Sequence, residues 1–150
     1  MNKIESFKVD HNMLDRGIYI SRTDGDIVTY DLRTRMPNSG DYMDNATMHT
    51  TEHMFATYVR NSDISDNVIY FGPMGCQTGF YLLVAKETPQ KVLEATKEVL
   101  KKIISHQGEV FGASAVECGN YRSLEISSAK EECKKYLEVL ESKDWDFKYE

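Results

Sequence analysis

The chain has 150 residues, a length typical of one domain with its own hydrophobic core. Apolar residues make up 41% of it and charged residues 28%, and no apolar run approaches the roughly 18 residues that a membrane-spanning helix needs. The net charge is −6 and no basic cluster occurs, which argues against nucleic acid or an anionic membrane as a partner. The N-terminal segment lacks the apolar core of a signal peptide, so a cytoplasmic location is expected by default.

The sequence contains three cysteines, Cys76, Cys118 and Cys133, which is an odd number. In a reducing compartment such residues are thiols, metal ligands or core residues more often than parts of a disulfide framework. No repeat, low-complexity tract or linker divides the chain. Residues 1–150 are therefore expected to form a single domain.

Two β-rich runs, residues 18–22 and 27–33, flank an Asp-Gly pair at residues 24–25. Asp-Gly favours the tight turn of a β-hairpin because Gly adopts positive φ at no steric cost. Two further short strands are expected at residues 67–71 and 80–84, joined by the loop GPMGCQTG. The sequence thus predicts a hairpin near the start and two strands in the middle of the chain.

A helix is expected between the hairpin and the later strands. Asp44 or Asn45 can cap its N-terminus, and the pattern continues to about Asn61. This helix carries the motif on which the functional interpretation depends.

Two more helices follow the strands. Thr88 can cap the first of them, Pro89 suits its first position, and Gly108 is expected to end it. The last helix is predicted to start near Ser128, because Ser128 and Glu131 have the spacing of a capping box. Its inward residues are expected to be Cys133, Tyr136, Leu137 and Leu140. This mixed order of elements predicts an α+β fold, with an antiparallel sheet packed against helices.

His49, Glu52 and His53 lie on the first of these helices. Positions i, i+3 and i+4 share one helical face, so the three side chains can point toward the same place. Two imidazoles four residues apart can bind one divalent ion, and H-x-x-E-H is the motif of the inverted zincins, with the glutamate acting on metal-bound water. The alternative is a pair of solvated or hydrogen-bonded histidines without a metal.

A third ligand has to come from elsewhere in the chain. Cys118 is a good candidate because Gly119 follows it and permits a tight backbone path near an ion. Two histidines and one cysteine leave a fourth position open, which is typical of catalytic sites. His11 and His106 compete with Cys118 for this role.

Cys76 lies between Gly75 and Gly79 in the loop before a strand. Small neighbours allow a substrate to approach a thiol closely, and a nearby cation would favour the thiolate. A buried cysteine that acts as a small apolar residue is the other interpretation. For Cys133, on the apolar stripe of the last helix, that second interpretation is preferred.

Five segments together resemble the S-ribosylhomocysteine lyase (LuxS) family, whose members produce the precursor of autoinducer-2. In chain order they are ESFKVDH, DLRTRMPN, MHTTEHMFATYVRN, GPMGCQTGFYLLV and ECGNY. Each would be weak evidence alone, but the resemblance covers nearly the whole length in the correct order. It implies an α+β fold similar to the inverted-zincin peptidases.

The resemblance implies a role for each matched residue. His49, His53 and Cys118 would be the metal ligands, and Glu52 and Cys76 the paired general acid and base. Positions that contact substrate in the family, or lie near it, are matched by Ser6, His11, Arg33 and Arg60. The metal of the family is natively Fe(II), replaced by Zn or Co in purified preparations. Its members are homodimers with both sites at the subunit interface.

The implied reaction cleaves the thioether of S-ribosylhomocysteine to homocysteine and 4,5-dihydroxy-2,3-pentanedione. The sugar carbonyl migrates through enediolates, and the thiolate is then eliminated. A bound metal would act as Lewis acid without changing its oxidation state, while Cys76 moves carbon-bound protons and Glu52 moves protons between oxygens.

The chain departs from the family at two positions. Tyr70 stands where many members have aspartate, and Leu124 where many have histidine, which bears on substrate affinity and local packing. Two other functions compete with the lyase. One is a metallopeptidase of the inverted-zincin type, which would give Cys76 no role, and the other is a non-catalytic metal-binding domain, which the open ligand position disfavours.

Overall fold

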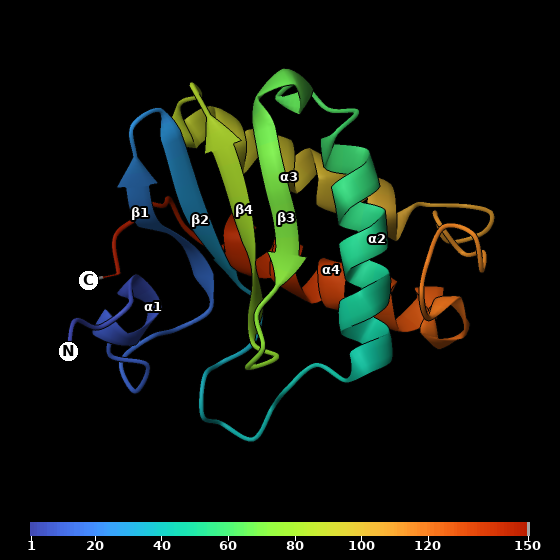
Figure 1. Ribbon diagram of the computed structural model, residues 1–150, viewed down its shortest axis with the longest axis horizontal. Helices are drawn as coiled ribbons and strands as arrows, with labels where there is room; N and C mark the ends of the chain where they lie inside the picture. Colours follow the sequence, from blue (N-terminus) through green and yellow to red (C-terminus); the bar gives the residue numbers. More distant parts are fainter. Residues whose placement is uncertain (150) are drawn as a thin grey trace.

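The computed structural model describes residues 1–149, which contain a four-stranded antiparallel sheet and several helices. The elements are α1 (Glu5–Lys8), β1 (Gly17–Asp24), β2 (Ile27–Arg33), α2 (Asn45–Val59), η1 (Ser65–Asn67), β3 (Val68–Pro73), β4 (Gly79–Ala85), α3 (Pro89–Ile104), η2 (Tyr121–Ser123) and α4 (Ile126–Glu141). The strand order is β1-β2-β4-β3. In Figure 1, α3 and α4 lie behind the sheet, α2 lies beside β3, and the short α1 lies beside β1. The predicted α+β class is confirmed.

The predicted β-hairpin is confirmed. β1 pairs with β2 so that Asp24 lies opposite Ile27. Gly25, in the turn between them, has a φ of 59°, in the left-handed region that glycine adopts without strain. The two later strands are confirmed as β3 and β4, with ends shifted by a few residues. Within residues 1–149, no helix combines the length and apolar character that crossing a membrane requires.

Helix α2 begins where the sequence predicted, because the carboxylate of Asp44 accepts a hydrogen bond from the backbone N–H of Thr47 at 2.7 Å. The helix ends at Val59, two residues before Asn61, and Arg60 is its C-cap. The buried residues of α2 are Thr47, Thr50, Thr51, Met54, Phe55 and Val59. These residues attach the helix to the core and leave another face for the histidines.

Helix α3 has the predicted cap, in which Thr88 accepts from Lys91 N, and Pro89 is its first residue. Its predicted end at Gly108 was too late. The helix stops at Ile104, where the C-cap Ser105 bonds back to Lys101 O. Gly108 lies in the turn beyond it.

The predicted N-cap of α4, Ser128, was wrong by three residues. The N-cap is Glu125, whose carboxylate accepts from Ser127 N at 2.9 Å and from Ser128 N at 3.1 Å. Hydrogen bonds from Ser127 and then Ser128 lower the pKa of Glu125 to about 2. Glutamate is an uncommon cap, so the capping-box spacing indicated Ser128 instead. Of the predicted inward residues Leu137 is only partly buried, whereas Cys133, Tyr136 and Leu140 are fully buried.

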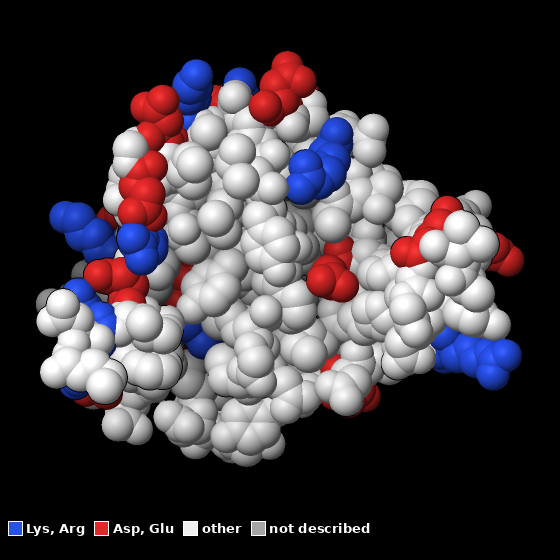
Figure 2. Space-filling view, viewed as in Figure 1, with Lys and Arg blue, Asp and Glu red and all other residues white. Residues whose placement is uncertain are grey.

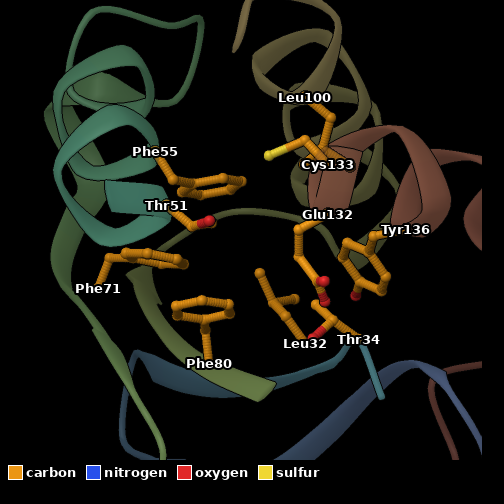
Figure 3. Close-up of a pocket in the computed structure, with 10 residues that line it drawn as sticks. All are labelled: Leu32, Thr34, Thr51, Phe55, Phe71, Phe80, Leu100, Glu132, Cys133 and Tyr136. Atoms are coloured by element: carbon orange, nitrogen blue, oxygen red, sulfur yellow. The ribbon is translucent and has the colours of Figure 1, made fainter. Parts of the chain in front are cut away.

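Aromatic stacking joins α2 to the sheet. The ring of Phe71 on β3 stacks between Phe55 of α2 and Phe80 of β4, with ring centroids 4.3 Å and 5.1 Å apart. Figure 3 shows these three rings together, with Glu132 and Cys133 of α4 on the opposite side of a small internal cavity. The packing fixes α2 against β3 and so determines where its other face points.

We predict that Asp44→Ala destabilises the protein by about 1 kcal/mol, since it removes the N-cap of α2. The free energy of unfolding should be measured by urea denaturation at fixed protein concentration. Asp44→Asn is the matched control, because an asparagine oxygen keeps the capping hydrogen bond and only the negative charge is lost. A loss in the asparagine variant as large as in the alanine variant at neutral pH would contradict the capping role.

The cap also predicts a dependence on pH. Hydrogen bonding from Thr47 lowers the pKa of Asp44 in the folded protein. The contribution of the Asp44 charge to the free energy of unfolding is therefore fully present above the pKa of aspartate in the unfolded chain. It is lost as the pH falls through the lower pKa that Asp44 has in the folded protein. The difference in stability between wild type and Asp44→Asn should decrease over that acidic range.

Candidate active site

The histidine motif occupies a partly exposed face of α2, next to the face that enters the core. His49, Glu52 and His53 are all half-buried, and the two imidazole rings lie with their centroids 4.7 Å apart. The segment between α3 and α4 returns past this face, at the right of Figure 1. That segment carries Cys118.

The structure brings Cys118 to the two histidines. One ligand atom from each of His49, His53 and Cys118 lies within 4.8 Å of the others. The Cys118 sulfur is 3.3 Å from His49 Nε2 and accepts a bond from the N–H of Asn120 at 3.4 Å. We call these three residues the metal group.

The hydrogen bonds of both imidazoles leave Nε2 free to coordinate. His53 Nδ1 lies 2.8 Å from the carbonyl oxygen of Phe111, which can only accept, so Nδ1 carries the proton. His49 Nδ1 lies 2.6 Å from Ser123 Oγ, whose own hydrogen is donated to Asn120 O. His49 Nδ1 is therefore also the donor. Fixing a histidine through its second nitrogen is the usual support of a metal ligand.

The chemistry of the metal group fits a divalent cation. Burial, followed by the neighbouring His53, lowers the pKa of His49, although Glu52 acts in the opposite direction. A neutral imidazole offers the lone pair that a metal needs. Two imidazole nitrogens and a thiolate suit Zn, Fe or Co.

The two competing histidines lie elsewhere. Both ring nitrogens of His106 are engaged, with Tyr58 OH at 2.7 Å and with Glu109 O at 2.9 Å. His11 Nδ1 bonds to Val9 O at 2.9 Å, in the N-terminal segment. Of the three candidates for the third ligand, only Cys118 is beside His49 and His53.

Four other residues singled out in the sequence line one pocket, formed by the N-terminal segment, the end of β2 and the turn between β3 and β4. They are Ser6, His11, Arg33 and Cys76. We call this the thiol pocket. The Cys76 side chain is exposed, and its sulfur lies 3.8 Å from Arg33 Nη1. The guanidinium places a positive charge beside this sulfur.

The residues that hold Arg33 in place were not predicted from the sequence. Its guanidinium forms two hydrogen bonds with the carboxylate of Asp31, at 3.1 and 2.7 Å, and both side chains are buried. Thr78 accepts another of its hydrogen bonds at 2.8 Å. A signal for Asp31 was available, because residues two apart on a strand share one face.

Arg60 belongs to neither the metal group nor the thiol pocket. Its guanidinium donates to Val68 O at 3.4 Å and Ile69 O at 3.2 Å, so it links the end of α2 to β3. The metal group and the thiol pocket also have no residue in common. In Figure 1, α1 and the segment beside α2 that carries Cys118 lie at opposite ends of the longest axis. One chain thus presents two separate groups of chemically active residues.

Two histidines and a cysteine that could hold one metal ion, on an α+β fold, have the donor set of a catalytic rather than a structural metal site, because three protein ligands leave a coordination position for substrate or water. The family model for S-ribosylhomocysteinase (LuxS) matches residues 4–146. The chain belongs to this family, and the resemblance identified from its motifs is confirmed.

Curated relatives agree with the family over almost their whole lengths. The S-ribosylhomocysteine lyase of Desulfotalea psychrophila is 46% identical, with 95% of this chain and 94% of the relative covered. The S-ribosylhomocysteine lyase of Finegoldia magna is also 46% identical, with 93% of this chain and 92% of the relative covered. That of Borreliella burgdorferi is 39% identical over 99% of both chains.

We predict that Ser123→Ala weakens metal binding at least about tenfold, since it removes the acceptor that orients His49. The affinity for Zn²⁺ should be measured by competition with a chromogenic chelator. Ser142→Ala is the matched control, because that serine only bonds to Val139 O at the end of α4. Equal affinities of wild type and Ser123→Ala would show that Ser123 does not support the ligand.

Proposed function

We propose that the protein is an S-ribosylhomocysteine lyase that converts S-ribosylhomocysteine to homocysteine and 4,5-dihydroxy-2,3-pentanedione. The observation that carries the proposal is the metal group, found in a chain that matches lyases of this name over almost its whole length. The same match weighs against the inverted-zincin peptidase, whose motif the chain shares. Residues 1–150 would act as one catalytic domain, which is supported by a single continuous core that spans the sheet and α2, α3 and α4.

His49, His53 and Cys118 would hold one divalent ion in each subunit, with Fe(II) as the ion in the cell and Zn or Co able to replace it. When bound, such an ion supplies Lewis-acid stabilisation for negative charge on the sugar oxygens. The proton on Nδ1 of each imidazole leaves Nε2 available for this ligation.

Proton transfer is assigned to Cys76 and Glu52. The Cys76 thiolate takes a proton from a sugar carbon and returns it to the neighbouring carbon, which moves the carbonyl along the chain. Glu52 moves the corresponding protons between the oxygens. After the carbonyl reaches C3, removal of the C4 proton forms a C4–C5 double bond as the C5–S bond breaks, and homocysteine leaves as the thiolate, which is then protonated. The enol left at C4 takes a proton at C5 and becomes the methyl ketone of 4,5-dihydroxy-2,3-pentanedione.

The remaining residues of the thiol pocket bind the substrate. Arg33 is always charged, and its pairing with Asp31 keeps it in place, so it can orient a sugar oxygen by a charge-assisted hydrogen bond. Ser6 and His11 offer further polar groups from the N-terminal segment. Arg60 acts at most indirectly, since its hydrogen bonds go to the backbone of β3.

Because Glu52 lies on α2 with the two histidines of the metal group, whereas Cys76 lines the thiol pocket, we propose that the complete site forms between two chains. A two-fold dimer would bring the metal group of each chain to the thiol pocket of the other. The view in Figure 2 supports such an interface, since charged side chains surround a largely uncharged area over the sheet. Large exposed side chains such as Tyr42, Ile69 and Tyr70 are of the type that protein interfaces bury.

We predict that Cys76→Ala lowers turnover of S-ribosylhomocysteine at least about 100-fold, as expected for loss of a general base. Homocysteine release should be followed with a chromogenic disulfide, and bound metal by elemental analysis. The metal content should stay at the wild-type level, whereas His49→Ala and Cys118→Ala should lose metal. Cys133→Ala is the control and should keep its activity, because Cys133 is a core residue.

The lyase assignment fails if wild-type protein loaded with metal releases no thiol from S-ribosylhomocysteine. The role of Cys76 fails if Cys76→Ala turns over at the normal rate. The two outcomes are separate, because the first concerns the wild type alone.

We predict that inactive Cys76→Ala and Glu52→Gln chains complement each other when mixed. In a random mixture about half of the dimers carry both variants, and each of these has one intact site, so about a quarter of wild-type activity should return. Mixing two preparations of Cys76→Ala is the control. No recovery after verified subunit exchange would place both residues of a working site in one chain.

A further inference from the structure

The hydroxyl of Thr78 links the two reactive side chains of the thiol pocket. Thr78 lies two residues after Cys76 and is buried, with 2% of its surface exposed. Its Oγ1 is 2.8 Å from Arg33 Nη1 and 3.0 Å from the Cys76 sulfur. The hydroxyl therefore contacts both groups at hydrogen-bonding distance, whereas Arg33 and Cys76 are 3.8 Å apart.

The chemistry of the three groups fixes the direction of these bonds. A guanidinium can only donate, so Thr78 Oγ1 accepts from Arg33. The hydroxyl hydrogen is then free to be donated, and the sulfur of Cys76 is the acceptor within reach. A hydrogen bond donated to sulfur stabilises the thiolate relative to the thiol. Arg33 polarises the same hydroxyl and strengthens its donation.

The orientation of the Arg33 guanidinium is fixed by Asp31. The carboxylate of Asp31 pairs with its Nε and Nη2, which leaves Nη1 directed at Thr78. Tyr149 OH donates to Asp31 Oδ2 at 2.9 Å. Burial, followed by the charge of Asp31, raises the pKa of Tyr149, so this phenol stays protonated and remains a donor. The chain of hydrogen bonds thus runs from Tyr149 to the sulfur.

The backbone around Thr78 is also fixed. Its carbonyl oxygen accepts from Thr34 N and Arg35 N, both at 3.0 Å. The preceding residue, Gln77, has a φ of 66°, which is uncommon for a residue with a side chain. Hydrogen bonds in both directions between Gln77 and Met43 maintain this conformation. The turn therefore presents the Thr78 hydroxyl in a defined position, without rearrangement.

We propose that Thr78 is a positioning residue for Cys76, which relays the charge of Arg33 to the sulfur and holds the thiolate toward the pocket. Its effect on turnover rests on the proposed lyase function. Its effect on the reactivity of the thiol does not, because any electrophile that reaches the pocket reports it.

The test compares Thr78→Val, which keeps the shape and removes the hydroxyl, with Thr78→Ser, which keeps the hydroxyl. Alkylation of Cys76 by iodoacetamide should be followed over a range of pH by mass spectrometry of the peptide that contains it. We expect Thr78→Val to react roughly tenfold more slowly at neutral pH, with its pH profile moved to higher pH. Thr78→Ser should restore the wild-type profile.

Thr34→Val is the matched control. Thr34 is a buried threonine in the same region, but its hydroxyl contacts Met43 and the carbonyl of Thr78 and does not reach the sulfur. Its alkylation profile should equal that of wild type. In the lyase assay, Thr78→Val should lower kcat and leave KM and bound metal nearly unchanged.

The proposal is overturned if folded Thr78→Val, checked by circular dichroism, alkylates like wild type at every pH. If Thr78→Val does not fold, Thr78→Ala replaces it, and the same comparison with Thr78→Ser decides. A wild-type protein that fails to cleave S-ribosylhomocysteine would defeat the proposed function alone, since the alkylation profiles would still support or overturn the role of Thr78.

Discussion

The candidate metal site depends on helix α2, which packs against the sheet on one face and contacts the segment between α3 and α4 on another. Phe55 and Thr51 of α2 face the internal cavity, where Phe55 stacks on Phe71 of the sheet, and this packing sets the rotation of the helix. The rotation in turn directs His49 and His53 toward the segment between α3 and α4. Because close-packed interiors deform little, the core holds the imidazoles in place even though they are partly exposed. The positions of the two imidazoles therefore depend on the packing of aromatic rings on another face of the same helix.

The metal group and the thiol pocket differ in the elements that form them. The metal group joins a helix to an irregular segment, and its hydrogen bonds fix the protons on the imidazoles. The thiol pocket joins a sheet edge, a turn and the N-terminal segment, and there a buried ion pair fixes a cation beside a sulfur. Each group is organised within a single chain, so the proposed dimer would need little rearrangement to form. Such preorganisation is what electrostatic catalysis requires.

Features that depend on neighbours in the sequence were predictable, whereas those that depend on the path of the chain were not. The shared face of His49 and His53 follows from the helical repeat, and the hairpin follows from its Asp-Gly turn. The choice among Cys118, His11 and His106 required knowing where the segment after α3 runs. The cap of α4 by Glu125 contradicts common preference, and the contact of Thr78 with Arg33 joins residues 45 positions apart. Motif resemblance assigned Arg33 a role but could not show what holds it.

The contact between Tyr149 and Asp31 spans 118 positions, and the Tyr149 ring also stacks on Tyr19 with ring centroids 4.9 Å apart. Chains fold from the N-terminus as they leave the ribosome, so the hairpin with Asp31 and Arg33 emerges long before its partner. Until Tyr149 follows, the Asp31 carboxylate lacks this donor. The hydrogen bond to Asp31 can therefore form only after residue 149 has been synthesised, and a product of translation termination before that residue would keep Cys76 while lacking this contact.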